Sequence, residues 1–339
     1  MTKTSLLGIA ALACFVFPQG AATPSAAQDD PLHLHVNVVL VQLNVAVTDN
    51  KGNYVTDLRP QDFEITEDKI PEKISTFEES SEPGKGTETA SDGDIVISRA
   101  PEASVFVLFD TSNYMYRSFV FAQDAIADFL RSMDNASKVA FYSYSRNLSR
   151  MTPLTSDQYS LINGVRNTVA GDDAALYNSL LLTVKDAVPL RGRKAIVVFS
   201  NGPDNASSVP PEDVAELAQS SGTIIYIIST REAQEDPTSA TAFERVSKAS
   251  GGKAYFARNW REEKQAFASI RKDLVHLYTL SYYPQPNPNR GWRAIHVKLI
   301  GKDLQKYHIR TRDGYRLLPV SPSPSIESSD PPPTGSASR

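Results

Sequence analysis

From residue 103 onward, short apolar segments alternate with longer segments of helical periodicity. The apolar segments lack a clear polar face, as expected for strands that helices cover on both sides. This alternation predicts an α/β fold with a doubly wound, mostly parallel sheet. The predicted strands are 104–109, 138–144, 194–200, 223–229 and 253–257, with 149–154 as an antiparallel edge strand. The predicted helices are about 118–133, 157–168, 174–188, 211–221, 240–250 and 261–277.

Both flanks of this region show the two-residue periodicity of strands instead. Three short strands are predicted on each side, and three strands bury too little apolar area to fold alone. We therefore expect residues 31–78 and 278–318 to pair into one β-sandwich-like module, with the α/β domain of residues 103–277 inserted between them. The predicted flanking strands are 33–48, 63–66, 73–77, 278–283, 293–299 and 307–311.

Two further segments have the composition of unstructured chain. Residues 79–102 begin with a polar, glycine-rich stretch without periodicity, which predicts an exposed linker. Residues 319–339 are rich in proline, serine and glycine, which predicts a disordered tail.

The amino terminus has the pattern of a secretory signal peptide. Lys3 precedes an apolar run, residues 6–17, that is too short to span a bilayer, and residues 25–27 (Ser-Ala-Ala) match a cleavage signal. We expect residues 1–27 to be removed and the mature protein to be secreted or periplasmic. Cys14, the only cysteine, lies in this run and matches a lipidation signal poorly, so the mature chain would have no thiol chemistry.

Charge and hydropathy exclude several classes of partner. The net charge is −4, and acidic and basic residues are interspersed. The sequence therefore predicts no basic surface patch of the kind that binds nucleic acid. No other segment reaches ~18 consecutive apolar residues, so no transmembrane segment is predicted. His33 and His35 share a strand face, but with no further ligand nearby we interpret them as a solvated strand end.

Polar side chains gather in three loops that the predicted topology brings to one edge of the sheet. Asp110 and Ser112 follow the first strand, residues 170–178 lead into a helix, and Asn201 follows the strand 194–200. Open α/β folds bind ligands at the carboxyl ends of their strands. The three loops therefore mark the candidate functional site.

In this order, the loops resemble those of a von Willebrand factor type A domain, whose fold is Rossmann-like. The whole chain resembles the von Willebrand factor A-related proteins of Acidobacteria, because residues 47–68 and 278–299 are similar to that family's amino-terminal and closing β-modules. The resemblance covers about residues 36–317. It implies a protein-interaction or adhesion module with a metal-ion-dependent adhesion site for Mg²⁺ or a similar cation. The family's ligand pattern is Asp-x-Ser-x-Ser in the first loop, Thr in the second and Asp in the third.

This chain departs from the pattern at three of its five positions. Asp110 and Ser112 are retained, whereas Tyr114, Ala174 and Asn201 replace a serine, a threonine and an aspartate. One carboxylate and one hydroxyl replace the hydration of a divalent ion poorly. We therefore interpret the site as degenerate, with Asp110, Ser112 and Asn201 as its remaining metal ligands and no cofactor expected.

Two alternatives to this interpretation stay open. An acid from Asp172, Asp173 or Asp204 would complete a rearranged site for Mg²⁺ or another divalent cation. A purely structural role would instead have Asp110 cap the turn after its strand, and the acids of the second loop begin a helix.

The leading hypothesis is that these loops bind an unidentified protein partner. The expected contact residues are Tyr114, Tyr116, Arg117, Asp172, Asp173 and Asp204. Tyrosine and arginine are enriched at the centres of protein interfaces, although packing against the β-module is an equal alternative for the aromatic residues. An enzyme is not expected, because no nucleophile-elbow, zinc-protease or phosphate-loop motif is present. Hydrolysis remains a remote alternative that would need a convergent Ser/His/Asp cluster.

Overall fold

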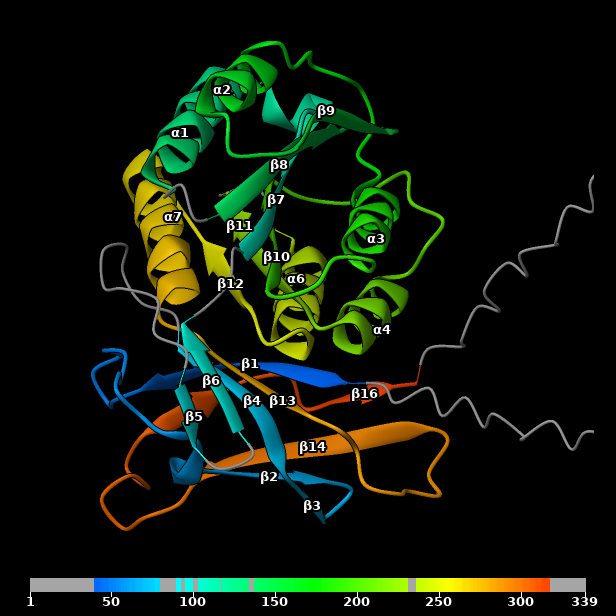
Figure 1. Ribbon diagram of the computed structural model, residues 1–339. Helices are drawn as coiled ribbons and strands as arrows, with labels where there is room; N and C mark the ends of the chain where they lie inside the picture. Colours follow the sequence, from blue (N-terminus) through cyan, green and yellow to red (C-terminus); the bar gives the residue numbers. More distant parts are fainter. Residues whose placement is uncertain are drawn as a thin grey trace, which may run out of the picture. The chain divides into compact units, whose positions relative to one another are not determined.

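The computed structural model describes residues 40–79, 90–92, 95–99, 103–116, 118–133, 137–230 and 236–317. It contains an α/β domain inserted into a β-module (Figure 1). The predicted signal peptide, the carboxyl-terminal tail, His33, His35 and Arg117 lie outside the described residues.

The α/β domain is built on a six-stranded sheet in the order β12-β11-β10-β7-β8-β9. Every neighbouring pair is parallel except β8 and β9, which are antiparallel. This confirms the predicted doubly wound, mostly parallel sheet and its antiparallel edge. The strands are β7 (Ala103–Asp110), β8 (Ser137–Tyr144), β9 (Leu148–Thr155), β10 (Lys194–Ser200), β11 (Thr223–Ser229) and β12 (Lys253–Phe256).

Helices cover both faces of this sheet (Figure 1). One face packs against α1 (Phe119–Ser132), α2 (Gln158–Arg166) and α7 (Trp260–Val275). The other packs against α3 (Leu176–Ala187), α4 (Pro211–Ser221) and α6 (Pro237–Ala249). The central strands are apolar on both faces because both faces are buried. None of the helices in the described ranges is long and apolar enough to cross a membrane.

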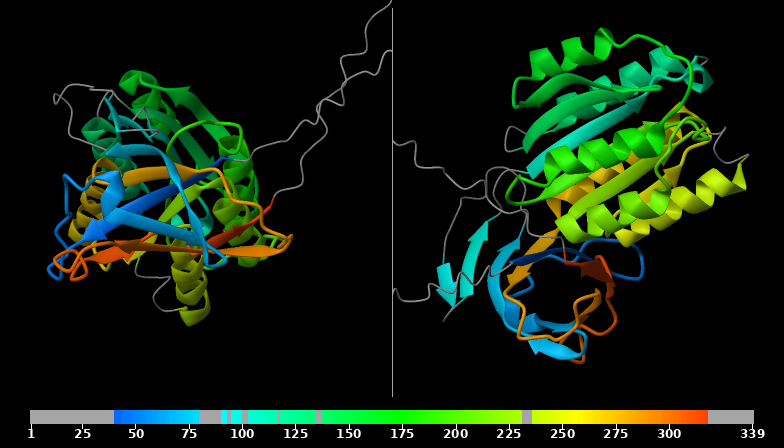
Figure 2. Two further views of the ribbon diagram at one scale, coloured as in Figure 1. Left: turned by 60° about the horizontal axis from the view of Figure 1, so that its bottom comes forward. Right: turned by 90° about the vertical axis from the view of Figure 1, so that its right-hand side faces the viewer.

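The β-module consists of two sheets, in the orders β15-β1-β13-β4-β6-β5 and β16-β14-β2-β3, that share one apolar core (Figure 2). Antiparallel pairing of β1 with β13 and of β2 with β14 joins strands from the two ends of the chain, as predicted. The amino-terminal strands are β1 (Val41–Thr48), β2 (Phe63–Glu67), β3 (Ile70–Glu72), β4 (Ile74–Glu79), β5 (Ala90–Asp92) and β6 (Ile95–Arg99). The carboxyl-terminal strands are β13 (Tyr278–Tyr282), β14 (Trp292–Leu299), β15 (His308–Arg310) and β16 (Gly314–Arg316).

The structure differs from the sequence expectation in the segment interpreted as a linker. Within residues 79–102, strands β5 and β6 extend the larger sheet, with β6 parallel to β4 and β5 antiparallel to β6. The apolar sequence Ile95-Val96-Ile97 has high strand propensity, and its pairing satisfies the backbone of β4, which would otherwise be a sheet edge.

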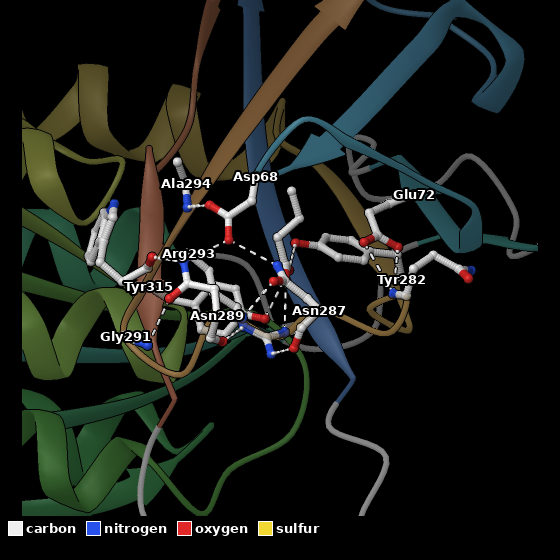
Figure 3. Close-up of polar contacts among 12 residues, drawn as sticks. Asp68, Glu72, Tyr282, Asn287, Asn289, Gly291, Arg293, Ala294 and Tyr315 are labelled. Atoms are coloured by element: carbon white, nitrogen blue, oxygen red, sulfur yellow. Dashed lines mark hydrogen bonds and ion pairs between the residues drawn. The ribbon is translucent and has the colours of Figure 1, made fainter.

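A buried charge lies in the core of the β-module. Glu67 accepts hydrogen bonds from Arg293 Nη1 (2.8 Å), Tyr282 Oη (2.8 Å) and Tyr315 Oη (2.9 Å). These three donors are labelled in Figure 3. The neighbouring Asp68 accepts bonds from the loop between β13 and β14 and from the backbone of β14. A buried carboxylate persists only when its lone pairs are satisfied in this way.

A second buried acid joins the β-module to the inserted domain. Asp273 of α7 accepts hydrogen bonds from Tyr226 Oη on β11 (2.6 Å) and from Tyr54 Oη in the module (2.7 Å). Arg310 of β15 also binds Asp273, and it donates to the backbone oxygen of Gly251. The inserted domain is therefore bonded to the module through specific polar contacts as well as through the chain itself.

Candidate functional site

Asp110 is buried at the carboxyl end of the central strand β7. Its Oδ1 accepts a hydrogen bond from the backbone N–H of Ser112 (2.9 Å), and its Oδ2 accepts one from Ser200 Oγ (2.8 Å). Burial raises the pKa of the Asp110 carboxyl, and these hydrogen bonds oppose that shift. Each oxygen of the carboxylate therefore already has one donor from the protein.

Ser200 and Tyr144 are members of the site that the loop motifs did not indicate. Tyr144 Oη donates to Ser200 Oγ (3.0 Å), which in turn donates to Asp110 Oδ2. These residues end β8 and β10, the two strands that flank β7. Both residues are the last of their strands, and the last residues of neighbouring parallel strands meet at one edge of the sheet. Their position at the strand ends could therefore have indicated them in the sequence.

The structure brings the three predicted loops together. The backbone N–H of Gly171 donates to Thr111 O (2.7 Å), and that of Asn113 donates to Asp172 O (2.8 Å). The Asn201 side chain donates through Nδ2 to the backbone oxygen of Tyr114. Loop-to-loop bonds of this kind hold the polar groups of the site in place.

Two buried oxygens at this junction, Ser112 Oγ and Asn201 Oδ1, lack a hydrogen bond of good geometry, and both side chains are almost fully buried. The Ser112 hydroxyl is nevertheless close enough to the Asp110 carboxylate to oppose the rise in the pKa of that acid. Buried polar atoms are normally paired, so each unsatisfied one needs an explanation such as a bound water or ion.

The second and third loops are joined around the start of α3. Ala174 is buried and supplies only backbone groups: its N–H donates to Asn205 Oδ1 (2.8 Å). Asp204 Oδ2 accepts from the backbone N–H of Tyr177 (3.0 Å), and Ser207 Oγ accepts from that of Asn178 (3.0 Å). The third loop therefore caps the amino terminus of α3, where unpaired N–H groups favour acidic and polar partners.

The acids expected to contact a partner occupy different environments. Asp172 is exposed, whereas Asp173 forms an ion pair with Arg146. Asp204 is occupied in capping α3 and in holding its own loop, because it also accepts from the backbone N–H and the hydroxyl of Ser207. Of the three carboxylates, that of Asp172 is the most accessible to a ligand.

Several exposed aromatic and apolar side chains flank these loops. Tyr116 is 58% exposed, Phe121 at the start of α1 is 66% exposed and Trp260 at the start of α7 is 54% exposed. Tyr114 and Val120 are also exposed. We call these five residues the aromatic rim. Phe121 and Trp260 line a cavity of about 280 Å³, together with Thr230, the residue that follows β11.

Comparison with known proteins agrees with this architecture. Residues 104–269 match the model of the von Willebrand factor type A domain family. The inserted domain has a von Willebrand factor type A-like fold. The match covers the strands and helices of the α/β sheet and leaves the β-module outside. No curated protein matches the chain.

Solved structures similar to the chain include several bacterial domains. BatB of Bacteroides thetaiotaomicron is 17% identical, with 51% of this chain and 97% of that chain covered and a TM-score of 0.43. A von Willebrand factor type A protein of Catenulispora acidiphila is 12% identical, with 75% and 74% covered and a TM-score of 0.46. The corresponding domain of the type V pilus tip protein Mfa5 of Porphyromonas gingivalis is 12% identical, with 52% and 95% covered and a TM-score of 0.44.

The donor set of the inserted domain fits a divalent cation only in part. Ser112 Oγ and Asn201 Oδ1 are available, and Asp110 supplies one carboxylate. Both Asp110 oxygens already accept hydrogen bonds, and Ala174 contributes no side-chain oxygen. Within the described ranges, no group of three or more His, Cys, Asp or Glu side chains is placed to hold a metal ion. A Mg²⁺ ion prefers six oxygens in an octahedron, so water would have to supply about half of the ligands.

Proposed function

We propose that the chain is a protein-interaction module of the adhesion type, secreted or periplasmic, with a degenerate metal-ion-dependent adhesion site. Its von Willebrand factor type A domain would bind a protein partner through the carboxyl edge of the sheet. The aromatic rim is the observation that carries this proposal. Clustered exposed aromatic side chains around a concave feature are typical of protein-binding surfaces.

The three loops would contribute to this surface in different ways. Tyr114, Tyr116 and Asp172 are exposed and would contact the partner directly, as would Arg117, which lies outside the described residues. Asp173 and Asp204 would act by holding the second and third loops in position. A rigid support of this kind lowers the conformational entropy lost on binding.

The test is a pull-down from the secreted or periplasmic fraction of the source organism, compared between variants. Tyr116→Ala combined with Phe121→Ala should abolish capture of the partner. Tyr159→Ala combined with Leu182→Ala is the matched control, because both side chains are exposed on helices α2 and α3 outside the aromatic rim. Equal capture by both double variants would disprove binding through the rim.

The second candidate function is adhesion that depends on a divalent cation. The unpaired Ser112 Oγ and Asn201 Oδ1 favour it, because a bound ion would satisfy both. Asp110 and Asp172 would then complete the set, with water in the remaining positions. Calorimetric titration with Mg²⁺, Mn²⁺ and Ca²⁺ distinguishes the two candidates. Binding that Ser112→Ala and Asn201→Ala each abolish supports a cation site, and absence of heat at millimolar cation excludes it.

A further inference from the structure

A cavity of about 480 Å³ lies at the other end of β10, where the inserted domain meets the β-module. Its cationic lining residues are Arg191, Lys194, Arg312 and Arg316. Leu40, Leu190 and Leu317 contribute an apolar wall. A volume of this size suits a small molecule. The cavity is separate from the loops of the candidate site, because β10 begins here and ends there.

Arg312 is buried in this cavity with unused hydrogen-bond donors. The residue is 5% exposed, and its Nη2 donates to the backbone oxygen of Gln42 (2.9 Å). Its Nε and Nη1 are buried and have no partner. A buried guanidinium with unsatisfied N–H groups costs several kcal/mol, on the order of the penalty for burying a charge without its counter-ion.

Lys194 adds a second buried cation to the same cavity. It is 7% exposed at the start of β10. Burial lowers the pKa of its ammonium group to about 8, and repulsion from Arg312 adds to this effect. The two side chains therefore destabilise one another unless a negative charge lies between them.

The described side chains that line the cavity supply no such charge. None of them is an aspartate or a glutamate. Glu67 acts on Arg312 only at a distance, and it is already bonded to Arg293, Tyr282 and Tyr315 (Figure 3). Arg316 pairs with Glu216 at 2.9 Å, a contact between two half-exposed side chains. The deficit of negative charge is therefore local to Arg312 and Lys194.

We propose that this cavity binds an oxyanion, a carboxylate or a phosphate, that carries a short apolar group. The oxygens would lie against the Lys194 ammonium group and the Arg312 guanidinium and would neutralise their charge. Charge-assisted bonds of this kind are about twice as strong as neutral ones. The apolar group would pack against Leu40, Leu190 and Leu317. Two buried cations without a partner destabilise the folded protein. Binding of the anion would stabilise it again.

The anion has two possible sources with the same chemistry. One is a free small molecule. The other is an acidic side chain of this protein, because Leu40 and Leu317 both line the cavity and stand next in sequence to segments that carry acids. These acids are Asp29, Asp30, Glu327 and Asp330.

The experiment measures the melting temperature and the heat of binding of the full chain. The probes are inorganic phosphate and hexanoate, each compared with chloride at equal ionic strength. For a free ligand, we expect a saturable rise in melting temperature of the unmodified protein. The Lys194→Met variant should bind the probe with an affinity at least tenfold lower. Arg258→Gln, which removes an arginine from the cavity beside Trp260, is the matched control and should respond like the unmodified protein.

Lys194→Met is the preferred test variant because it is expected to fold. Arg312→Gln removes a bond to β1 and risks unfolding the protein, whereas Lys194→Met removes only a buried charge and should raise the melting temperature without ligand. An equal, saturable rise in melting temperature of Lys194→Met and the unmodified protein with phosphate or hexanoate would overturn the proposal.

A further variant separates the two sources of the anion. It combines Asp29→Asn, Asp30→Asn, Glu327→Gln and Asp330→Asn. A response in the unmodified protein indicates a free ligand. A response that appears only in this neutralised variant indicates that the chain's own acids occupy the cavity. No response in either protein excludes an oxyanion site.

Discussion

Arg310 of β15 donates to both carboxylate oxygens of Asp273 on α7, at 2.5 Å each. One residue comes from the β-module and the other from the inserted domain. Because Asp273 is fully buried and also accepts from Tyr226 and Tyr54, this pair forms the polar centre of the junction. The two parts of the chain should therefore unfold together.

Asp273→Asn tests this coupling. The change leaves Arg310 without its counter-ion, and removing one partner of a buried pair typically costs about 3–5 kcal/mol; we expect the lower end, because Arg310 is about one-third exposed. Urea denaturation followed by tryptophan fluorescence measures the change. Asp128→Asn is the control, because Asp128 of α1 forms only exposed ion pairs, with Arg131 of the same helix and with Lys264 of α7, each worth under about 1 kcal/mol. Equal losses in the two variants would contradict a central role for Asp273.

Gly251→Ala should also weaken the junction. Gly251 has a φ of 82°, and a Cβ atom there would lie 2.9 Å from the backbone nitrogen of Arg312. The left-handed conformation alone costs about 1–2 kcal/mol, and the clash adds to it. Gly52→Ala is the matched control, since its φ is 80° but no atom lies within 4 Å of the added Cβ. Thermal unfolding should show a larger loss for Gly251→Ala, and equal losses would mean that the close approach is not strained.

Ser200→Ala should destabilise the carboxyl edge of the sheet. It removes the hydroxyl that links Tyr144 Oη to Asp110 Oδ2 and leaves both groups buried without this partner. An unsatisfied buried group costs about 1–3 kcal/mol. Ser229→Ala, at the end of the neighbouring strand β11, is the control, because the only hydrogen bond described for its hydroxyl is a long one, 3.4 Å. A double-mutant cycle of Ser200→Ala with Tyr144→Phe should give a coupling energy clearly above zero.

Lys194 should make stability depend on alkaline pH. Its pKa is about 8 in the folded protein, below the ordinary value of 10.5. Between these values the unfolded chain binds more protons, so the free energy of unfolding should rise as the pH increases from about 8 to 10.5. The full rise is on the order of 3–4 kcal/mol, since one pKa unit corresponds to about 1.4 kcal/mol and the two pKa values differ by about 2.5 units.

Burial also lowers the pKa of Arg312 and raises the pKa of Tyr278, Tyr282 and Tyr315, so these groups contribute to stability at alkaline pH. The comparison with Lys194→Met isolates the lysine. This variant should be more stable near pH 7 and should lack the lysine's contribution to the slope. Denaturant titrations at several pH values provide the measurement. Parallel pH profiles for the two proteins would show that Lys194 is not buried as a charge.

The α/β sheet could be predicted because its strands are buried on both faces and its helices are amphipathic, so periodicity alone separates them. That strands of the two flanks pair with one another was expected from the small size of each flank, whereas the particular pairing of β1 with β13 was not. Three-residue strands such as β3 and β16 could not be predicted, because two-residue periodicity needs a longer segment to be visible.

The candidate site was predictable only as far as its loops. Asp110, Ser112 and Asn201 were found from their positions after strands, whereas the bonds through Ser200 depend on which strands are neighbours. The cavity of Lys194 and Arg312 depends on how the module's last strands meet the start of β10. No local pattern in the sequence carries that information.

The antiparallel pairing of β1 with β13 determines how the protein would respond to pulling. Val41 pairs with Tyr282, and Val45 pairs with Tyr278, the residue that begins β13 shortly after α7. A force applied between the amino-terminal end of β1 and the inserted domain would draw the two strands along their length in opposite directions. All hydrogen bonds of the pair would then be loaded at once in shear, a geometry that resists force better than sequential unzipping. Anchored through its amino-terminal flank and held at the aromatic rim, the protein would behave as a mechanically strong tether.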